Sequence, residues 1–453
     1  MNLARALRLS PSALSGSFAA SAQNNARVIS LVGAGGKTTA MFQIARELVQ
    51  SQSSSVILTA TAHLGTWQTS LADHHLVTNN LNELADIPSH GITLITGDIE
   101  NERTKPASQI ILSWLREYKQ ERGIPLLIEA DGSRQKSLKA PAAHEPPIPE
   151  FTDTVIVVVG LTTLGKPLTD DFVHRAEIFS QLSGLQTNQP ITPDALTRFL
   201  THPQGGLKNI PPAARCVAFL NQADTPELQS MGGNMARELL NHFDSVIVGA
   251  LQHNNIQTFE HCAGIILAAG ESTRFGSPKQ LLDWKGKSFV RQVAETALQA
   301  GLWPVEVVTG FHHADVESAL SGLPVNIVHS PQYQQGQSTS IRAGINALPP
   351  NVGASIFLLA DQPQIPVEVI RALIESHSRE MQTILAPLVL EERRANPVLF
   401  DQVAFPDLLK LTGDVGGRAI FDKHRVEYLP WHDDILLFDV DKPEDYQRLK
   451  EME

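Results

Sequence analysis

Short apolar runs rich in β-branched residues alternate with amphipathic stretches along most of the chain, and this alternation constrains the fold more than any other feature. The runs that we expect to form strands in the first half are 28–32, 55–61, 92–96, 126–130, 155–159, 217–220 and 246–248. Each run is nearly all apolar, as a strand covered on both faces requires. Because strands separated by helical segments are typical of parallel sheets, the pattern predicts an α/β fold.

A polar stretch without periodicity, residues 251–262, separates this series from a second one. The expected strands of the second series are 265–269, 305–309, 325–329, 356–360 and 384–387. The chain has 453 residues, more than the roughly 250 to 300 that one core usually supports. We therefore expect two α/β domains, residues 1–257 and 258–453.

One helix of the second series can be placed by its ends. Ser288 can cap a helix that runs over residues 289–300, and Gly301 supplies the left-handed residue that stops it. Pro304 then prevents continuation. This punctuation favours a strand–helix–strand unit over residues 265–309.

Composition excludes several classes of function. The chain has 36 Lys and Arg against 48 Asp and Glu, and the net charge of −12 repels nucleic acids and anionic lipids. Its longest wholly apolar runs, such as residues 155–159, are far below the ~20 residues of a membrane helix. The first 26 residues lack a secretory pattern, and the two cysteines, Cys216 and Cys262, suit a reducing compartment. We expect a cytoplasmic protein that binds neither nucleic acid nor membrane.

A loop rich in small residues follows the first strand of the second domain. Leu267, Ala268, Ala269 and Gly270 would let backbone N–H groups approach a ligand, and Ser272, Arg274 and Lys279 follow on the same loop. The loop lacks the Gly-Lys-Ser/Thr of a P-loop, so we predict a phosphate-binding loop of another type. The alternative is a glycine turn with two solvated cations.

Three acidic residues could complete such a site with a metal ion. Asp361 follows the expected strand 356–360, at the strand end where α/β sheets bind ligands. Asp439 and Asp441 lie on one face of an extended segment near the C-terminus. Carboxylate oxygens are what a hard cation such as Mg²⁺ (or Mn²⁺) requires. A turn and the cap of a final helix is the alternative for Asp439 and Asp441.

Residues 336–344 place the hydroxyls of Ser338, Thr339 and Ser340 before an expected helix. In that position they can cap the helix or hold a nucleotide. The spacing leaves both interpretations open.

Five motifs in order give residues 264–444 a family resemblance. They are Leu-Ala-Ala-Gly (267–270), Arg-Phe-Gly-Ser-Pro-Lys-Gln-Leu-Leu (274–282), Ala-Asp-Gln-Pro (360–363), Asn-Pro-Val-Leu-Phe (396–400) and Asp-Val-Asp-Lys-Pro-Glu-Asp (439–445). The region resembles the molybdenum cofactor nucleotidyltransferases, and within them most closely the cytidylyltransferases. The resemblance implies a Rossmann-like, GT-A-like nucleotidyltransferase sheet.

The resemblance also implies a reaction: transfer of CMP from CTP onto the terminal phosphate of molybdopterin, with release of pyrophosphate. It implies catalytic roles for Arg274, Lys279 and Asp361, and a metal held by Asp361 with Asp441 or Asp439. The implied nucleotide contacts are Leu267, Ala268, Ala269, Gly270, Ser272 and Ser340. Relatives that transfer GMP tend to have glycine where Ala269 stands, so its methyl group could narrow the base slot. GTP as donor, or another phosphate acceptor, is the alternative.

The first domain begins with a degenerate P-loop. The expected strand 28–32 leads through Gly33, Gly35 and Gly36 into Lys37, Thr38 and Thr39, which open an apolar helical pattern. Backbone donors, an ammonium and a hydroxyl would then lie where phosphates and Mg²⁺ bind in P-loop proteins. Leu31 replaces the first glycine of the strict pattern.

Two further pieces of the first domain fit a nucleotide. Glu129 and Asp131 follow an expected strand, where Walker-B acids lie. Asn221-Gln222-Ala223-Asp224 resembles the base reader of GTPases, with Gln222 in place of lysine. Together the pieces predict a P-loop-NTPase-like parallel sheet that binds ATP or GTP, against the alternative of a structural glycine turn. Arg134, Lys136 and Lys139 form a basic cluster that could meet an anion or solvate a loop.

The first half resembles the YqeC-type accessory proteins of selenium-dependent molybdenum hydroxylases. The motifs are Val-Gly-Ala-Gly-Gly-Lys-Thr-Thr (32–39), Glu-Ala-Asp-Gly-Ser-Arg (129–134), Lys-Ala-Pro-Ala-Ala-His-Glu-Pro (139–146), Gly-Lys-Pro-Leu (165–168) and Gly-Gly-Leu-Lys (205–208). The resemblance implies a role in hydroxylase maturation, with a molybdenum hydroxylase apoenzyme as partner. A non-catalytic, nucleotide-gated delivery module is the alternative.

Overall fold

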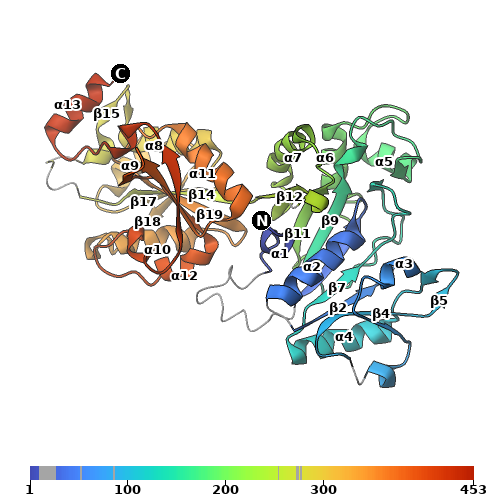
Figure 1. The fold of residues 1–453 in the computed structure, drawn as a ribbon. Helices are drawn as coiled ribbons and strands as arrows, with labels where there is room; N and C mark the ends of the chain where they lie inside the picture. The colour runs from blue at the N-terminus through green and yellow to red at the C-terminus, as the bar shows by residue number, and fades with distance from the viewer. Residues whose placement is uncertain are drawn as a thin grey trace. The chain divides into compact units, whose positions relative to one another are not determined.

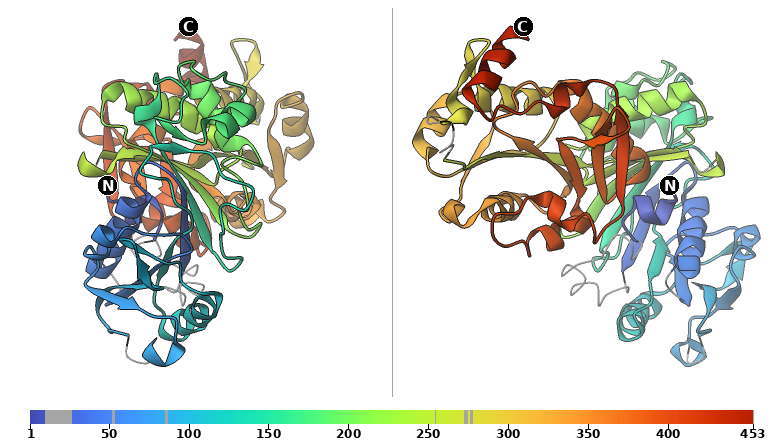
Figure 2. Two further views of the ribbon diagram at one scale, coloured as in Figure 1. Left: turned by 90° about the vertical axis from the view of Figure 1, so that its right-hand side faces the viewer. Right: turned by 60° about the vertical axis from the view of Figure 1, so that its left-hand side comes forward.

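The computed structural model describes residues 1–9, 27–51, 54–84, 87–253, 255–271, 275 and 278–452. The chain forms two compact units, of which the N-terminal one ends at Phe259 and the C-terminal one begins at Glu260 (Figure 1). Each unit has its own sheet, with helices on both faces (Figure 2). Among the described residues, no helix combines the length and apolar character that crossing a bilayer requires.

The N-terminal unit is built on a nine-stranded sheet. Its strands are β1 (Val28–Gly33), β2 (Ser55–Ala60), β3 (His74–Val77), β4 (Gly91–Thr96), β7 (Leu126–Glu129), β9 (Thr154–Gly160), β11 (Arg215–Asn221), β12 (Ser245–Ala250) and β13 (Asn255–Phe259). Their order is β13-β12-β11-β9-β1-β7-β2-β4-β3, and every pair from β12 to β3 is parallel. The predicted parallel sheet is confirmed there.

The predicted linker 251–262 is wrong in part, because β13 pairs antiparallel with β12 at the edge of the sheet. Ile256 and Thr258 of β13 are buried, whereas Asn255 is exposed and Gln257 is half-buried. An edge strand with one covered face needs few apolar residues, and its sequence therefore resembles a loop.

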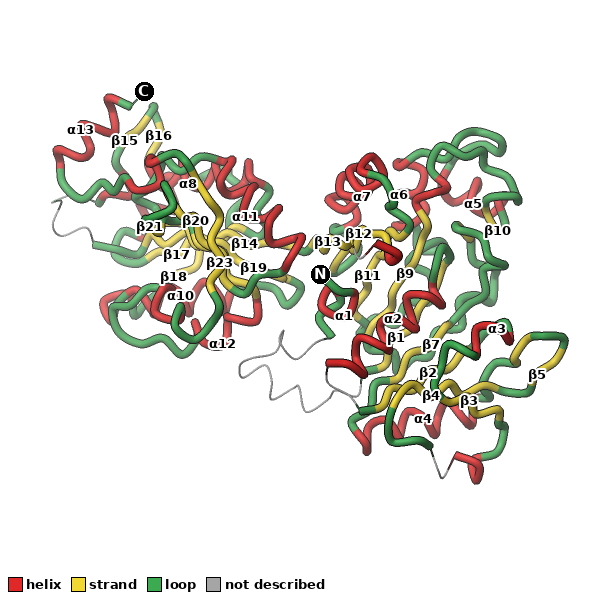
Figure 3. The backbone as a smooth tube through the Cα atoms, in the orientation of Figure 1, coloured by secondary structure: helices red, strands yellow, loops and turns green. Residues whose placement is uncertain are grey.

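Helices cover both faces of this sheet (Figures 1 and 3). On one face lie α1 (Leu3–Ala6) and α2 (Lys37–Ser51). On the other face lie α4 (Gln109–Arg122), α5 (Ala176–Ser183), α6 (Pro193–Thr201) and α7 (Pro226–Leu239). Smaller elements are α3 (Thr66–Thr69), the hairpin of β5 (Ile99–Glu100) and β6 (Arg103–Thr104), and the pair of β8 (Leu138–Lys139) and β10 (Val173–His174).

The C-terminal unit has an eight-stranded mixed sheet. Its strands are β14 (His261–Ala268), β17 (Val305–Thr309), β18 (Asn326–His329), β19 (Val352–Leu359), β20 (Ile384–Val389), β21 (Arg393–Arg394), β22 (Val398–Asp401) and β23 (Val426–Trp431). Strands β18-β17-β14-β19 run parallel, and β22 lies antiparallel between β19 and β20. The parallel strands place the ends of β14 and β19 side by side.

Helices again lie on both faces. Helices α8 (Phe289–Ala300), α9 (His313–Ala319) and α11 (Val367–Glu380) cover one face, and α10 (Gln337–Ala347) and α12 (Phe405–Leu408) cover the other (Figure 1). The predicted helix 289–300 is confirmed as α8, and Gly301 ends it with φ +87°. Ser288 occupies the N-cap position, but its side chain makes no capping hydrogen bond.

The C-terminal helix α13 (Pro443–Glu451) packs on the hairpin of β15 (Asp283–Trp284) and β16 (Lys287–Ser288). Trp284, Phe289, Val440 and Leu449 form the small core between them. Val440 is buried there, and this burial holds its two acidic neighbours, Asp439 and Asp441, next to the sheet.

Candidate active site

A pocket of about 770 Å³ lies at the carboxyl ends of β14 and β19. Leu267 of β14 pairs with Leu359 of β19, so the loops that follow these two strands start from adjacent points. Of the predicted residues, Leu267, Ala268, Ala269, Gly270, Lys279, Ser340 and Asp361 line the pocket. Ser272 and Arg274 lie outside the described residues.

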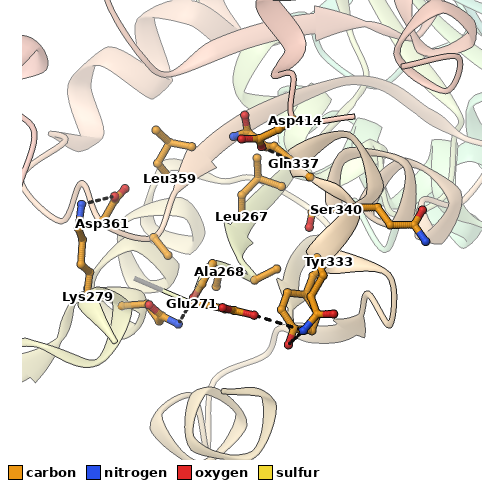
Figure 4. A pocket seen from close by; sticks show the side chains of 17 residues that line it. Leu267, Ala268, Glu271, Lys279, Tyr333, Gln337, Ser340, Leu359, Asp361 and Asp414 are labelled. Atoms are coloured by element: carbon orange, nitrogen blue, oxygen red, sulfur yellow. Dashed lines mark hydrogen bonds and ion pairs between the residues drawn. The ribbon is translucent and has the colours of Figure 1, made fainter. Parts of the chain in front are cut away.

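Lys279 brings the charged end of the pocket together (Figure 4). Its Nζ lies 2.8 Å from Oδ1 of Asp441 and 3.7 Å from Oδ2 of Asp361. Three predicted residues from distant parts of the chain therefore meet at one point. Asp441 is held by the start of α13, where Asp445 accepts hydrogen bonds from the N–H groups of Asp441 and Lys442.

Asp439 reaches the same region through Gln362, which sequence reasoning did not single out. The Gln362 amide is buried and donates to Oδ1 of Asp439 at 2.5 Å, while its carbonyl oxygen accepts from Asn396 at 3.4 Å. The position of Gln362 directly after Asp361 was the available signal, because a polar residue at a buried strand end needs partners.

The electrostatics of this end fit a divalent cation. Burial raises the pKa of Asp361, the carboxylates of Asp439 and Asp441 raise it further, and Lys279 opposes them. Lys279 pairs with Asp361 and Asp441, and Asp439 is held nearby by Gln362, so the carboxylates outnumber the one ammonium. Among the described residues these acids are not already gathered into a group of three that could hold a metal ion, so a cation would be shared with a bound nucleotide. Mg²⁺ or Mn²⁺ prefers hard oxygen ligands such as carboxylates.

The opposite end of the pocket is also polar, but no described residue that lines it is a lysine. Figure 4 shows Tyr333, Gln337, Ser340 and Asp414 at the end away from Lys279 and Asp361. A pocket with Lys279 and Asp361 at one end, and hydroxyl and amide groups together with Asp414 at the other, suits a nucleotide whose phosphates and base need different surroundings.

The prediction that hydroxyls precede the helix is wrong. Helix α10 begins at Gln337, so Ser338, Thr339 and Ser340 lie within its first turn. The N–H of Gln337 is capped instead by Oδ1 of Asp414 at 3.1 Å, from a loop that passes against Gly336. A cap supplied by a residue 77 positions away leaves no local signal.

In the N-terminal unit, the predicted loop links β1 to α2, and its side chains meet the predicted acids. Nζ of Lys37 lies 2.7 Å from the Gly33 carbonyl, 3.1 Å from Asp131 and 3.8 Å from Glu129. The hydroxyl of Thr38 donates to Oε2 of Glu129 at 2.6 Å. Burial lowers the pKa of Lys37, but Asp131 and Glu129 outweigh that effect and the net pKa is raised.

Of the other predicted residues of this unit, some lie at the loop and others do not. Nδ2 of Asn221 donates to the Gly35 carbonyl at 2.7 Å, so Asn221 belongs to the loop. Thr39 is exposed on α2. Asp224 is exposed, and within the described residues it makes no hydrogen bond or ion pair to the loop. The structure thus brings Lys37, Thr38, Glu129, Asp131 and Asn221 together without Asp224.

The predicted basic cluster is wrong for Lys139. Its ammonium is buried, 2.9 Å from Asp131 and 3.0 Å from Glu145, whereas Arg134 is exposed. Arg175 pairs with Glu145 at 2.7 Å. Lys139, which was predicted to meet an anion or to solvate a loop, is therefore a link in a buried charge network.

Glu145 gives this network a testable pH dependence. Burial acts to raise its pKa, but hydrogen bonds from Arg175, from the Ala142 N–H and from Lys139 outweigh burial and lower the pKa from 4.5 to about 2. A depressed pKa contributes stability above about pH 4.5, and this contribution is lost as the pH falls towards 2.

We expect Glu145→Gln to lower the free energy of unfolding at pH 7, and the gap to wild type to narrow between pH 4.5 and 2. Urea denaturation of both proteins across this range measures the gap, with Glu150→Gln at an exposed position as the control. A gap that stays constant with pH would contradict the role of the ion pairs.

The C-terminal unit has a small-residue loop, a lysine and carboxylates around one pocket at the ends of parallel strands, an arrangement that suits nucleotidyl transfer. Residues 264–428 match the model of the MobA-like NTP transferase domain, and residues 29–177 match that of the YqeC protein. The chain belongs to the YqeC family through its N-terminal unit, and its C-terminal unit contains a MobA-like NTP transferase domain.

Individual relatives agree with this division. The protein YqeC of Escherichia coli (strain K12) is 31% identical over 249 residues, which are 51% of this chain and 91% of that protein. The purine catabolism protein PucB of Bacillus subtilis (strain 168) is 30% identical over 206 residues, 41% of this chain and 95% of that protein. A probable molybdenum cofactor guanylyltransferase of Bacillus mycoides (strain KBAB4) is 28% identical over 141 residues, 30% of this chain and 66% of that protein.

Proposed function

We propose that the C-terminal unit transfers CMP from CTP to the terminal phosphate of the molybdenum cofactor, giving the cytosine dinucleotide form and pyrophosphate. The observation that carries the proposal is the meeting of Lys279, Asp361 and Asp441 at one end of the pocket. The likeness to a protein named as a molybdenum cofactor guanylyltransferase supports the acceptor.

The reaction needs position and charge rather than a protein nucleophile. A phosphate oxygen of the acceptor attacks the α-phosphorus of CTP in line, a new P–O bond forms, and the bond to the pyrophosphate oxygen breaks. Lys279 supplies fixed positive charge beside the departing phosphates. Asp361, with Asp441 or Asp439, would hold Mg²⁺ (or Mn²⁺), which when bound neutralises charge on the triphosphate.

The base end of the pocket gives a prediction about donor choice. Ala269 is buried and lines the pocket next to Gly270. In the proposed complex its methyl group would narrow the space for the base and so favour a pyrimidine. We expect Ala269→Gly to raise kcat/KM for GTP relative to CTP. Steady-state kinetics with both nucleotides measure the ratio, and an unchanged ratio would refute the role of the methyl group.

Pyrophosphate release from CTP, GTP and ATP, with and without molybdenum-loaded molybdopterin, tests the whole proposal. We expect release that depends on the acceptor and is fastest with CTP. Faster release with GTP would overturn the base assignment. Release with a sugar phosphate or polyol phosphate, and none with molybdopterin, would overturn the acceptor.

For the N-terminal unit we propose an accessory role in the maturation of a molybdenum hydroxylase in the cytoplasm. Membership of the YqeC family and fusion to the transferase on one chain support this role. The test is activation of a molybdenum hydroxylase apoenzyme by the full chain. Activation that is unchanged by substitutions in the Lys37–Asp131 cluster would favour a passive delivery module instead.

A further inference from the structure

The turn between β1 and α2 adopts a backbone conformation that favours glycine at three positions. Gly33, Gly35 and Gly36 have φ values of +92°, +80° and +116°. Residues with a side chain rarely adopt this backbone conformation. A Cβ on Gly33 would lie 2.2 Å from the Val158 carbonyl oxygen, so the turn is also wedged against β9. The N–H groups of the turn itself are already used: Gly33 donates to Asp131, and Ala34 and Gly35 donate to the carbonyls of Val158 and Lys136. The turn therefore positions the start of α2 rather than offering donors of its own.

The N-terminus of helix α2 provides backbone N–H groups that could bind an anion. Its first backbone bond runs from the Ala40 N–H to the Gly36 carbonyl, so the N–H groups of residues 36–39 have no carbonyl partner within the helix. The helix has 15 residues, and the partial positive charge at its N-terminus favours phosphate. Lys37 adds an ammonium at the same place, 2.7 Å from the Gly33 carbonyl.

Asn221 is the independent sign of a ligand. The side chain is buried, its Nδ2 donates to the Gly35 carbonyl at 2.7 Å, and a Cβ on Gly36 would meet that nitrogen at 2.5 Å. The amide therefore lies directly over the turn. Its Oδ1 is buried without a hydrogen-bond partner among the residues that the structure describes. A buried acceptor without a donor is rare, and a hydroxyl or amine of a ligand would satisfy it.

The charges around the turn show what kind of anion fits. Lys37, Lys139 and Arg175 are linked in a chain of ion pairs with Glu129, Asp131 and Glu145, and these six charges cancel. A free triphosphate would therefore meet no excess positive charge and two nearby carboxylates. A triphosphate that arrives with a divalent cation avoids this repulsion. The hydroxyl of Thr38 and the carboxylate of Glu129, 2.6 Å apart, offer that cation two hard oxygen ligands.

The same ion-pair network also lowers the free-energy cost of moving Lys37 from Asp131 to a phosphate. If the ammonium of Lys37 moves from Asp131 to a phosphate, Asp131 keeps Lys139 at 2.9 Å and the Gly33 N–H at 3.1 Å. Asp131 is then not left buried without a cation, which would otherwise oppose binding. Glu129 loses its ion pair with Lys37, and in the proposed complex the divalent cation would take the place of that ammonium.

We propose that the N-terminal unit holds a second nucleotide site, which binds a nucleoside triphosphate together with a divalent cation. The phosphates lie on the N–H groups of residues 36–39 and on Lys37, and Thr38 and Glu129 hold the cation. Asn221 accepts a hydrogen bond from the sugar or the base. This site is separate from the transferase pocket, because other residues form it and it lies in the N-terminal unit.

Equilibrium dialysis of the full chain with labelled ATP, GTP or CTP, each with and without Mg²⁺, tests this site. We expect the wild-type chain to bind one equivalent of at least one of these three nucleotides at this site. Lys37→Ala should weaken that binding by roughly 10- to 100-fold. Thr38→Val, which removes only a hydroxyl, should weaken the Mg²⁺-dependent part of the binding. Lys166→Ala, at an exposed position of the same unit, is the matched control and should bind as wild type.

Each outcome decides the matter. Unchanged binding by Lys37→Ala and Thr38→Val, binding that does not depend on Mg²⁺, or no binding of any of the three probes would overturn the proposal. Lys37→Ala should retain pyrophosphate release from CTP by the C-terminal unit. Failure of the second site and failure of the proposed transferase can therefore be told apart.

Discussion

Asp361→Asn should reduce pyrophosphate release from CTP to background while the protein stays folded. Asp361 lies two residues after the end of β19, lines the pocket, and has Oδ2 3.7 Å from Nζ of Lys279. Asparagine has the same shape but removes the negative charge that a divalent cation and Lys279 would both use. The measurement is acceptor-dependent pyrophosphate release under saturating CTP.

The control for this variant is Asp422→Asn, which removes an exposed carboxylate from the same unit. Thermal unfolding of both variants shows whether the fold is retained. A folded Asp361→Asn protein with wild-type pyrophosphate release would remove Asp361 from the reaction.

Lys279→Ala should lower kcat by about 10²- to 10³-fold, the loss typical of one fixed donor to developing charge. The ammonium is half-buried and 2.8 Å from Asp441, so its position is set before the substrate arrives. Because it acts on charge that grows during the reaction, we expect a smaller change in KM for CTP than in kcat.

Steady-state kinetics of Lys279→Ala beside Lys423→Ala, an exposed lysine of the same unit, measure this difference. A rise in KM with kcat unchanged would mean that Lys279 only binds the ground state. Equal kinetics of both variants would remove it from the site altogether.

The sequence predicts most of the parallel strands of both sheets, because strands buried on both faces must be apolar throughout. It misses β22, a buried strand of four residues between β19 and β20. Strands with a solvent-exposed face are also harder to predict, and β23, which is mostly half-buried along its length, was not predicted. Where one face is open to solvent, the pattern that marks a strand weakens.

The same distinction holds for the site. Ala269, Lys279 and Asp361 could be predicted because loops after parallel strands meet at one edge of the sheet. Asp414 could not be predicted, because its partner Gln337 is 77 residues away in the chain. For Gln362, whose partner Asp439 is equally distant, the available signal was its place directly after Asp361. In the N-terminal unit, the burial of Lys139 depends on Glu145 and Arg175, which fold around it only in three dimensions.

Binding of Mn²⁺ in the presence of CTP, followed by electron paramagnetic resonance, tests the central claim most directly. The full chain should carry Lys37→Ala so that only the C-terminal pocket is counted. We predict one CTP-dependent Mn²⁺ per chain, and a clear loss of affinity when either Asp361→Asn or Asp441→Asn is added. Unchanged Mn²⁺ affinity in both variants would show that these carboxylates and Lys279 do not surround a metal-bound triphosphate.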